Sequence, residues 1–321
     1  MDVISLTRKL LSFNTVNPPG NEEVIAKYVG GILAGHGFKI EYPVFENNRL
    51  HLIAEKGLSS ERPPIVLSGH FDTVPLGNKS WSVDPFTGEV NDGKIWGRGS
   101  SDMKGGLASM ILASIGAFTE TPPAGGIRLI FSAGEELGCQ GISKLVEEKK
   151  GLGEASAIIV GEPTANLPVT GHKGALYLKA ITSGKTAHSS MPELGVNAIY
   201  KAARSIVKII DFNFEAEADP LLGYPTLNVG TISGGMNINS IPDQAEFTID
   251  VRSTTKVDHS KILNKLRREI GDETVIKTLV DLKPVFTSEN DPFVQIVYDV
   301  CKVKRMRDGF PKALPYLTDG A

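Results

Sequence analysis

The sequence predicts an α/β protein, in which a mostly parallel mixed sheet flanked by helices carries an inserted α+β domain. Short apolar runs alternate with helical patterns in the first half of the chain. A β-α-β-β-α-β order of elements begins near Gly174, and a further helix signal follows Lys283. A length of 321 residues also suits two domains better than one.

Residues 21–33 form an amphipathic pattern that predicts a helix, which Gly37 would end. Further helices are expected over 103–118 and 139–148. Apolar runs bounded by Gly or Pro predict buried parallel strands at 65–67, 127–132 and 157–160. Strands and helices that alternate in this way indicate an α/β sheet.

The second pattern predicts a ferredoxin-like domain. Its expected elements are strand 175–182, helix 195–210, strands 226–232 and 245–252, helix 258–270 and strand 274–281. In 245–252 apolar and polar residues alternate, which is typical of a sheet with one packed and one polar face. Asp291 and Pro292 then indicate the start of a helix that reaches about Val303. We therefore expect residues 1–173 and 283–321 to form one domain, with 174–282 inserted in it.

Composition argues against nucleic-acid-binding, membrane-spanning and secreted proteins. The net charge of −3 gives no reason to expect nucleic acid or an anionic membrane surface as a partner. No apolar stretch approaches the roughly 20 residues of a membrane span, and the N-terminus has no signal-peptide pattern. Cys139 and Cys301 lack motif spacing and are expected to be reduced, which favours a cytoplasmic protein.

An imidazole and several carboxylates follow the predicted strands. His70, the pair Glu135 and Glu136, and Glu162 each come shortly after an apolar run. Ligands of open α/β sheets bind beyond the carboxyl ends of the strands, so these groups are expected to converge. Asp102 follows a Gly-rich loop just before a helix, where the helix dipole favours a carboxylate.

Each of these signals alone has an ordinary explanation. A histidine at a strand end is usually packed or solvated, an aspartate before a helix is usually a cap, and paired glutamates on a loop usually face water. Their common position at strand ends favours a hydrolytic metal site instead. Imidazole with carboxylates suits zinc, manganese or cobalt and not a thiolate-preferring metal.

Longer motifs around these residues resemble the M20 metallopeptidase and deacylase family. Its branches include acetylornithine deacetylase, succinyl-diaminopimelate desuccinylase and glutamate carboxypeptidase. The matching segments are GHFDTVP at 69–75, GRGSSDMKGG at 97–106, SAGEE at 132–136, GEPT at 161–164, TAHSSMP at 186–192 and GGMNINSIP at 234–242. The resemblance runs from near the N-terminus to the last residue.

The resemblance implies a centre of two divalent metal ions, with zinc expected and cobalt or manganese as alternatives. His70 and Glu162 would bind one metal and Glu136 the other, with Asp102 bridging both. Family members continue past residues 318–320 and add a late histidine that completes the second site. We therefore expect a C-terminally shortened chain whose second metal site is incomplete, because His36, His51, His172 and His259 lie in no matching context. The lost segment would also leave a sheet edge or apolar face exposed.

The resemblance also implies catalytic roles. Asp72 would hold His70 by a hydrogen bond, and Glu135 would take a proton from the metal-bound water. His188 would reach the active site of a partner subunit and stabilise the oxyanion, in a homodimer formed through the lid domain 174–282. Asn239 and Arg252 would hold the substrate, although a solvated strand position remains an alternative for Arg252.

The expected reaction is hydrolysis of the amide bond of a small N-acyl amino acid, or of a peptide. The segment after His188 resembles the acetylornithine deacetylase and carboxypeptidase branches more than the desuccinylases. A carboxypeptidase or dipeptidase activity is the enzymatic alternative. An inactive, truncated dimeric form that lacks a metal ligand is the alternative of a different class.

Overall fold

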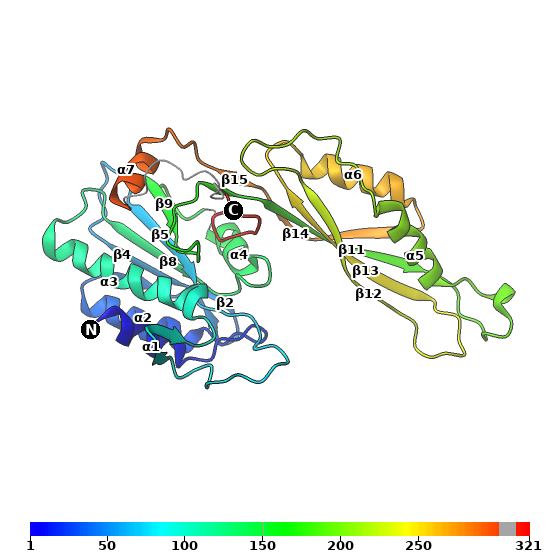
Figure 1. Cartoon of the computed structure of the whole chain (residues 1–321), viewed down its shortest axis with the longest axis horizontal. Coiled ribbons are helices and arrows are strands. Elements are labelled where there is room, and N and C mark those ends of the chain that lie inside the picture. Colours follow the sequence, from blue (N-terminus) through cyan, green and yellow to red (C-terminus); the bar gives the residue numbers. More distant parts are fainter. Residues whose placement is uncertain (150, 302–312) are drawn as a thin grey trace. The chain divides into compact units, whose positions relative to one another are not determined.

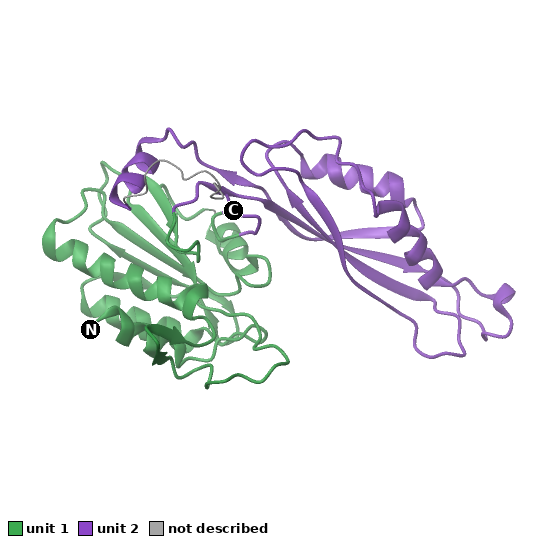
Figure 2. Ribbon diagram, in the orientation of Figure 1, with its two compact units in different colours: residues 1–167, 318–320 green, residues 168–317, 321 purple. Residues whose placement is uncertain are grey.

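The computed structural model describes residues 1–149, 151–301 and 313–321, and it divides into two compact units (Figure 2). The first unit comprises Met1–Leu167 and Thr318–Gly320, and the second comprises Pro168–Leu317 and Ala321. Residues 283–301 and 313–317 thus fall in the second unit, whereas we expected them in the first domain. The division into functional domains stays a prediction.

The first unit is built on a five-stranded sheet in the order β1-β4-β8-β5-β9 (Figure 1). Its strands are β1 (Lys39–Glu41), β4 (Leu52–Lys56), β5 (Ile65–His70), β8 (Ile127–Ser132) and β9 (Ala157–Val160). The mixed sheet is confirmed, but parallel pairs do not predominate. Strand β5 pairs in parallel with β8 and β9, whereas β4 pairs antiparallel with β1 and β8. The connection from β1 to β4 is too short for the crossover that a parallel pair needs.

Three helices pack against this sheet: α1 (Val3–Leu11), α2 (Glu23–Gly35) and α3 (Gly105–Glu120). Leu10, Val29 and Leu107 from these helices join Leu129 and Phe131 of β8 in one buried cluster. The predicted helix over 103–118 begins two residues late, because the turn η1 (Ser100–Lys104) has non-helical backbone angles at its third and fourth residues. The remaining elements are α4 (Gln140–Lys149), β2 (Val44–Glu46), β3 (Arg49–Leu50), β6 (Glu89–Asn91) and β7 (Lys94–Trp96).

Strand β9 corrects one expectation. We predicted a buried strand, but Ile158 is 60% exposed and Ile159 is 38% exposed. The reason is position, since β9 pairs only with β5 among the described residues and forms the edge of the sheet. An apolar run of this length does not distinguish a central strand from an edge strand.

A buried ion pair fixes the start of α2 on β3. Arg49 Nε donates to Glu22 Oε2 over 2.8 Å, and Arg49 Nη2 lies 2.5 Å from Glu22 Oε1. Both side chains are almost fully buried. Two parallel hydrogen bonds of this kind offset the cost of burying both charges, so the pair holds one geometry.

The second unit contains a four-stranded antiparallel sheet in the order β12-β13-β11-β14. Its elements are β11 (Gly174–Ser183), α5 (Ala198–Ile209), β12 (Thr226–Gly234), β13 (Gln244–Ser253), α6 (His259–Ile270) and β14 (Thr274–Leu282). The predicted β-α-β-β-α-β order and ferredoxin-like topology are confirmed. Both helices cover one face, where Ala202 and Leu266 pack against Phe247 and Ile249.

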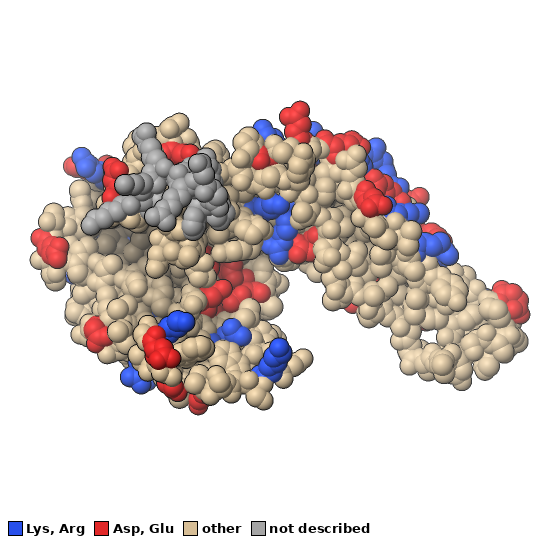
Figure 3. Space-filling view, viewed as in Figure 1, with Lys and Arg blue, Asp and Glu red and all other residues tan. Residues whose placement is uncertain are grey.

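The other face of this sheet is polar, as the alternation in 245–252 predicted. Phe247 and Ile249 are buried, whereas Thr248, Asp250 and Arg252 are partly exposed. Figure 3 shows basic and acidic side chains interspersed on the surface of α6, whose Lys265 lies near Glu215 and Glu269.

The second unit also contains β10 (Gly171–His172), η2 (Pro192–Leu194), β15 (Val285–Phe286) and α7 (Pro292–Val300). Asp291 caps α7 as predicted, because its side chain accepts a hydrogen bond from Phe293 N over 2.8 Å. The expected helix end near Val303 lies outside the described residues. Across the described ranges, none of the helices combines the length and apolarity that a bilayer crossing requires.

Candidate metal centre

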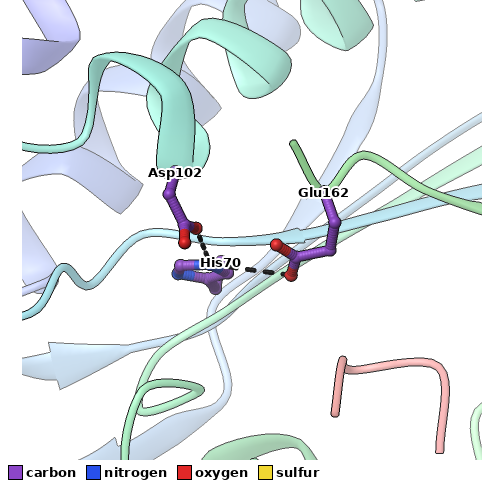
Figure 4. A group of neighbouring side chains, drawn as sticks. All are labelled: His70, Asp102 and Glu162. Carbon is purple, nitrogen blue, oxygen red and sulfur yellow. Dashed lines mark hydrogen bonds and ion pairs between the residues drawn. The ribbon is translucent and has the colours of Figure 1, made fainter. Parts of the chain in front are cut away.

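Three predicted ligands converge at the carboxyl edge of the first sheet (Figure 4). His70 Nε2 lies 3.1 Å from Asp102 Oδ1 and 3.7 Å from Glu162 Oε1. One ligand atom from each residue lies within 4.8 Å of the others, a spacing at which a single cation could contact all three. His70 is buried, whereas half of the Asp102 side-chain surface is exposed, so the group opens to solvent on the Asp102 side.

The sheet topology explains this convergence. Parallel strands end at the same edge, and His70 closes β5 directly beside Ser132, the last residue of β8. Glycine allows the η1 turn to approach closely, because a Cβ at Gly69 would lie only 2.5 Å from Met103 Cε. A Cβ at Gly161, which precedes Glu162, would lie 2.7 Å from Met110 Cε.

Asp72 orients the imidazole, although mainly through its backbone. His70 Nδ1 lies 3.0 Å from the Asp72 carbonyl oxygen and 3.5 Å from its carboxylate Oδ1. We predicted a contact through the side chain, and the carbonyl is the closer acceptor. If His70 loses the Nε2 proton that faces Asp102, the proton held on Nδ1 would leave the Nε2 lone pair for a metal, which is the tautomer that a metal requires.

The Asp72 carboxylate holds the loop that carries the two glutamates. It accepts hydrogen bonds from the backbone N–H groups of Gly134, Glu135 and Glu136 over 3.0–3.1 Å, and from Asn17 Nδ2 over 2.8 Å. Burial acts to raise the pKa of Asp72, but His70 and these donors outweigh it and lower the pKa to about 2. Asp72 is therefore an anion that ties β5 to the loop after β8.

Several carboxylates lie close together around His70. Burial raises the pKa of Glu136 and of Glu162 to about 7, and the neighbouring Asp102 carboxylate adds to the effect. Burial alone would lower the pKa of His70, but hydrogen bonds to Asp102 and Asp72 hold it well above its usual value. A cation bound by these side chains would therefore replace the protons that they take up at neutral pH.

A buried carboxylate oxygen without a hydrogen-bond partner also indicates a place for a cation. Glu162 Oε1 is buried and has no hydrogen-bond partner among the described residues. A buried carboxylate oxygen normally has a donor, so its lone pairs remain available to a ligand. Glu162, His70 and Asp102 therefore fit one divalent cation. Glu136 forms no group of three with other potential ligands in the described ranges.

Glu135 faces a second group that the sequence analysis missed. One ligand atom each from Glu135, Cys139 and Asp319 lies within 4.8 Å of the others, and all three residues are enclosed. Cys139 Sγ donates to Glu135 Oε1 over 3.4 Å, and Ser132 Oγ donates to Asp319 Oδ2. The spacing of four residues between Glu135 and Cys139 was a usable signal, whereas nothing local places Asp319 beside them.

Two of the predicted lid residues lie together. His188 forms a backbone bridge with Ser240, and Ser189 N donates to the Asn239 carbonyl oxygen over 3.0 Å. The His188 imidazole is exposed, and its Nδ1 lies 2.8 Å from Ser190 Oγ. His188 and Asn239 therefore sit on adjoining loops at one end of the second sheet.

Arg252 lies toward the opposite end of that sheet. It faces Thr226 at the start of β12, whereas the Asn239 loop follows the end of that strand at Gly234. Its guanidinium contacts Asp250 through two hydrogen bonds, of 2.8 Å and 3.2 Å, and lies over the ring of Tyr177.

The other four histidines lie outside the His70 group. His51 Nδ1 accepts a hydrogen bond from Ala133 N over 3.1 Å, and His259 lies between Asp281 and Ser253. His36 ends α2, and His172 is buried in β10. None of these four joins the His70 group among the described residues.

Comparisons with known proteins point to one family of hydrolases. Residues 170–278 match the M20 peptidase dimerisation domain, and residues 52–219 match peptidase family M28. A probable succinyl-diaminopimelate desuccinylase of Staphylococcus aureus is 30% identical over 350 residues, which cover 99% of this chain and 86% of that protein. An acetylornithine deacetylase of Myxococcus xanthus is 31% identical over 291 residues, which cover 88% of this chain and 73% of that protein.

A solved structure shares the fold. The M20 family metallo-carboxypeptidase of Sulfolobus solfataricus superimposes with a TM-score of 0.81 at 20% identity, covering all of this chain and 87% of that one. The sheet, the ligand group at its carboxyl edge and these likenesses define a metal-dependent hydrolase of amide or peptide bonds. The chain belongs to the M20 peptidase family.

The raised pKa values predict how metal and pH act on stability. Glu136 and Glu162 have pKa values of about 7 in the fold, against an ordinary 4.5, so the folded chain binds more protons than the unfolded chain between these values. With respect to these groups, the stability of the metal-free protein should therefore be highest below pH 4.5. It should fall as the pH rises from 4.5 through 7, by at most about 3 kcal/mol for each group. Added zinc should raise the melting temperature more at pH 8 than at pH 5.

Scanning fluorimetry of chelator-treated protein, with and without zinc, measures this. Glu162→Gln should flatten the pH profile and reduce the zinc effect, whereas Glu154→Gln, at an exposed position, should leave both unchanged. A zinc effect of equal size at both pH values would show that these carboxylates do not receive the metal.

Proposed function

We propose that the chain hydrolyses the amide bond of an N-acyl amino acid. The observation that carries the proposal is the convergence of His70, Asp102 and Glu162 beside the loop that bears Glu135 and Glu136. A divalent metal bound there would polarise the amide carbonyl and make a water molecule acidic near neutral pH. Glu135 would take the proton of that water and pass it to the leaving amine.

We propose two metal ions, with zinc as the expected species, at sites of unequal affinity. His70 and Glu162 would hold one metal, Glu136 would hold the other, and Asp102 would lie between them. The second site is weaker, because Asp102 and Glu136 are its only predicted protein ligands in the described ranges. Titration calorimetry of metal-free protein with zinc should therefore give two phases. Glu162→Gln should remove the tight phase and Glu136→Gln the weak one, and a single phase of two equally tight ions would contradict this assignment.

Glu135→Gln tests the proposed base. Turnover of an N-acetyl amino acid by zinc- or cobalt-loaded protein should fall by roughly 10²- to 10⁴-fold, because the amide cannot accept the proton. Metal content measured by atomic emission should not change, since Glu135 is not a proposed ligand. Glu147→Gln on the exposed side of α4 is the matched control. Unchanged turnover in the Glu135 variant would refute the role.

The substrate class rests on the relatives and on the segment around His188. Both curated relatives have names that describe removal of an acyl group from an amino acid. The solved carboxypeptidase of the same fold supports peptide cleavage as the second candidate. A panel of N-acetyl amino acids, N-succinyl amino acids and dipeptides separates the two. Absence of turnover on the whole panel with added metal would favour the inactive form.

We further propose a homodimer through the ferredoxin-like domain, in which His188 stabilises the oxyanion in the partner's site. The match to a dimerisation domain supports the dimer, and the exposure of the His188 imidazole supports its availability. Asn239 would act with His188 because their loops adjoin, and Arg252 would bind the substrate carboxylate.

Mixing two inactive variants tests this arrangement. Glu135→Gln and His188→Ala should each be nearly inactive alone. Mixed and allowed to exchange subunits, they should regain activity, because one site of each heterodimer receives an intact Glu135 and an intact partner His188. Light scattering confirms the dimer. Failure to regain activity despite proven exchange would place His188 in its own chain's site or outside catalysis.

A further inference from the structure

We infer that Glu135, Cys139 and Asp319 form a separate binding site for a thiophilic divalent cation, and that occupation of this site inhibits the enzyme. One carboxylate oxygen from each acid and the Cys139 sulfur lie within 4.8 Å of one another. This group shares no residue with the His70 group. The expectation of a reduced cysteine without motif spacing does not account for the position of Cys139 between two carboxylates.

The geometry suits a small cation. Cys139 Sγ and Glu135 Oε1 are 3.4 Å apart, about the distance between two ligands of one tetrahedral zinc ion, whose bonds are about 2.0–2.3 Å long. Ser132 donates to Asp319 Oδ2 and so fixes that carboxylate from one side. The three protein ligands leave a fourth position for water.

An unpartnered oxygen marks the place of the ligand. Asp319 is 8% exposed, and its Oδ1 is buried with no hydrogen-bond partner among the described residues. Such an acceptor is costly to leave unpaired. Within the described ranges, no lysine, arginine or histidine forms an ion pair with Glu135 or Asp319. A divalent cation among these three groups would give the unpartnered Asp319 oxygen a partner.

The ligand set selects a different metal from the His70 group. A thiolate with two carboxylates favours zinc or cadmium over magnesium, calcium or manganese, which prefer oxygen alone. On binding, the Cys139 thiol releases its proton to solvent and the sulfur becomes the ligand. The same cation would also engage the Glu135 carboxylate. The inhibition, unlike the binding, therefore rests on the proposed role of Glu135 as the base.

Cadmium spectroscopy tests the site without any assay of hydrolysis. The background is Cys301→Ser, which removes the exposed cysteine, and the His70 group is first saturated with zinc. Titration with cadmium should produce the ultraviolet charge-transfer band of a cadmium–thiolate bond. The band should be missing when Cys139→Ser is added, because serine offers no thiolate. A band that survives Cys139→Ser, or no band in the Cys301→Ser protein, would overturn the site.

A second variant keeps the proposal testable if Cys139→Ser folds poorly. Asp319→Asn retains Cys139 but removes one anionic ligand, so cadmium affinity measured by the band should fall at least about tenfold. Circular dichroism reports whether each variant is folded. An unchanged affinity in folded Asp319→Asn protein would count against the site.

The inhibitory role has its own readout. Turnover of each variant is measured over rising zinc concentrations. In the Cys301→Ser protein turnover should rise as the two proposed catalytic metals bind and fall again at excess zinc, whereas after Cys139→Ser the fall should be absent. A cadmium band without zinc inhibition would retain the site and refute the inhibition. Lack of turnover at every zinc concentration would instead count against the proposed hydrolase function.

Discussion

The arrangement of the site depends on one buried carboxylate. Asp72 follows β5, and its side chain accepts the backbone N–H groups of the loop after β8, while its carbonyl oxygen contacts His70. Two strands that are neighbours in the sheet are thereby joined beyond their ends. The ligand imidazole and the loop with Glu135 and Glu136 are positioned by the same residue. A change at Asp72 would disturb the proposed metal binding and the proposed proton transfer together, because both use this anchor.

Local sequence patterns predicted much of the fold. The strands over 127–132 and 157–160 have the predicted bounds, and alternation in 245–252 gave the correct buried face of β13. The strand ends also placed His70 and Glu162 at one edge, because parallel neighbours finish together. These features follow from the hydrophobic periodicity of each segment and from the parallel direction of neighbouring strands.

Other features depend on contacts that no local pattern encodes. Ile158 is exposed because β9 has a neighbouring strand on one side only among the described residues. The same apolar run would be buried in the middle of a sheet. The group of Glu135 and Asp319 joins residues far apart in the sequence. The pairing of Arg252 with Asp250 depends on side-chain geometry rather than on residue type. Sequence patterns located the charged groups, and tertiary packing determined their partners.

The exposed edge of the first sheet has a consequence for the ligand group. Strand β9 ends at Val160, two residues before Glu162, and among the described residues only its β5 side is hydrogen-bonded. An unpaired strand edge with apolar side chains is a template for a further strand. Any strand that docks there would order the backbone that leads to Glu162 and lower the entropy lost when this carboxylate binds a cation. The affinity of the proposed metal site is thereby coupled to the pairing of the β9 edge.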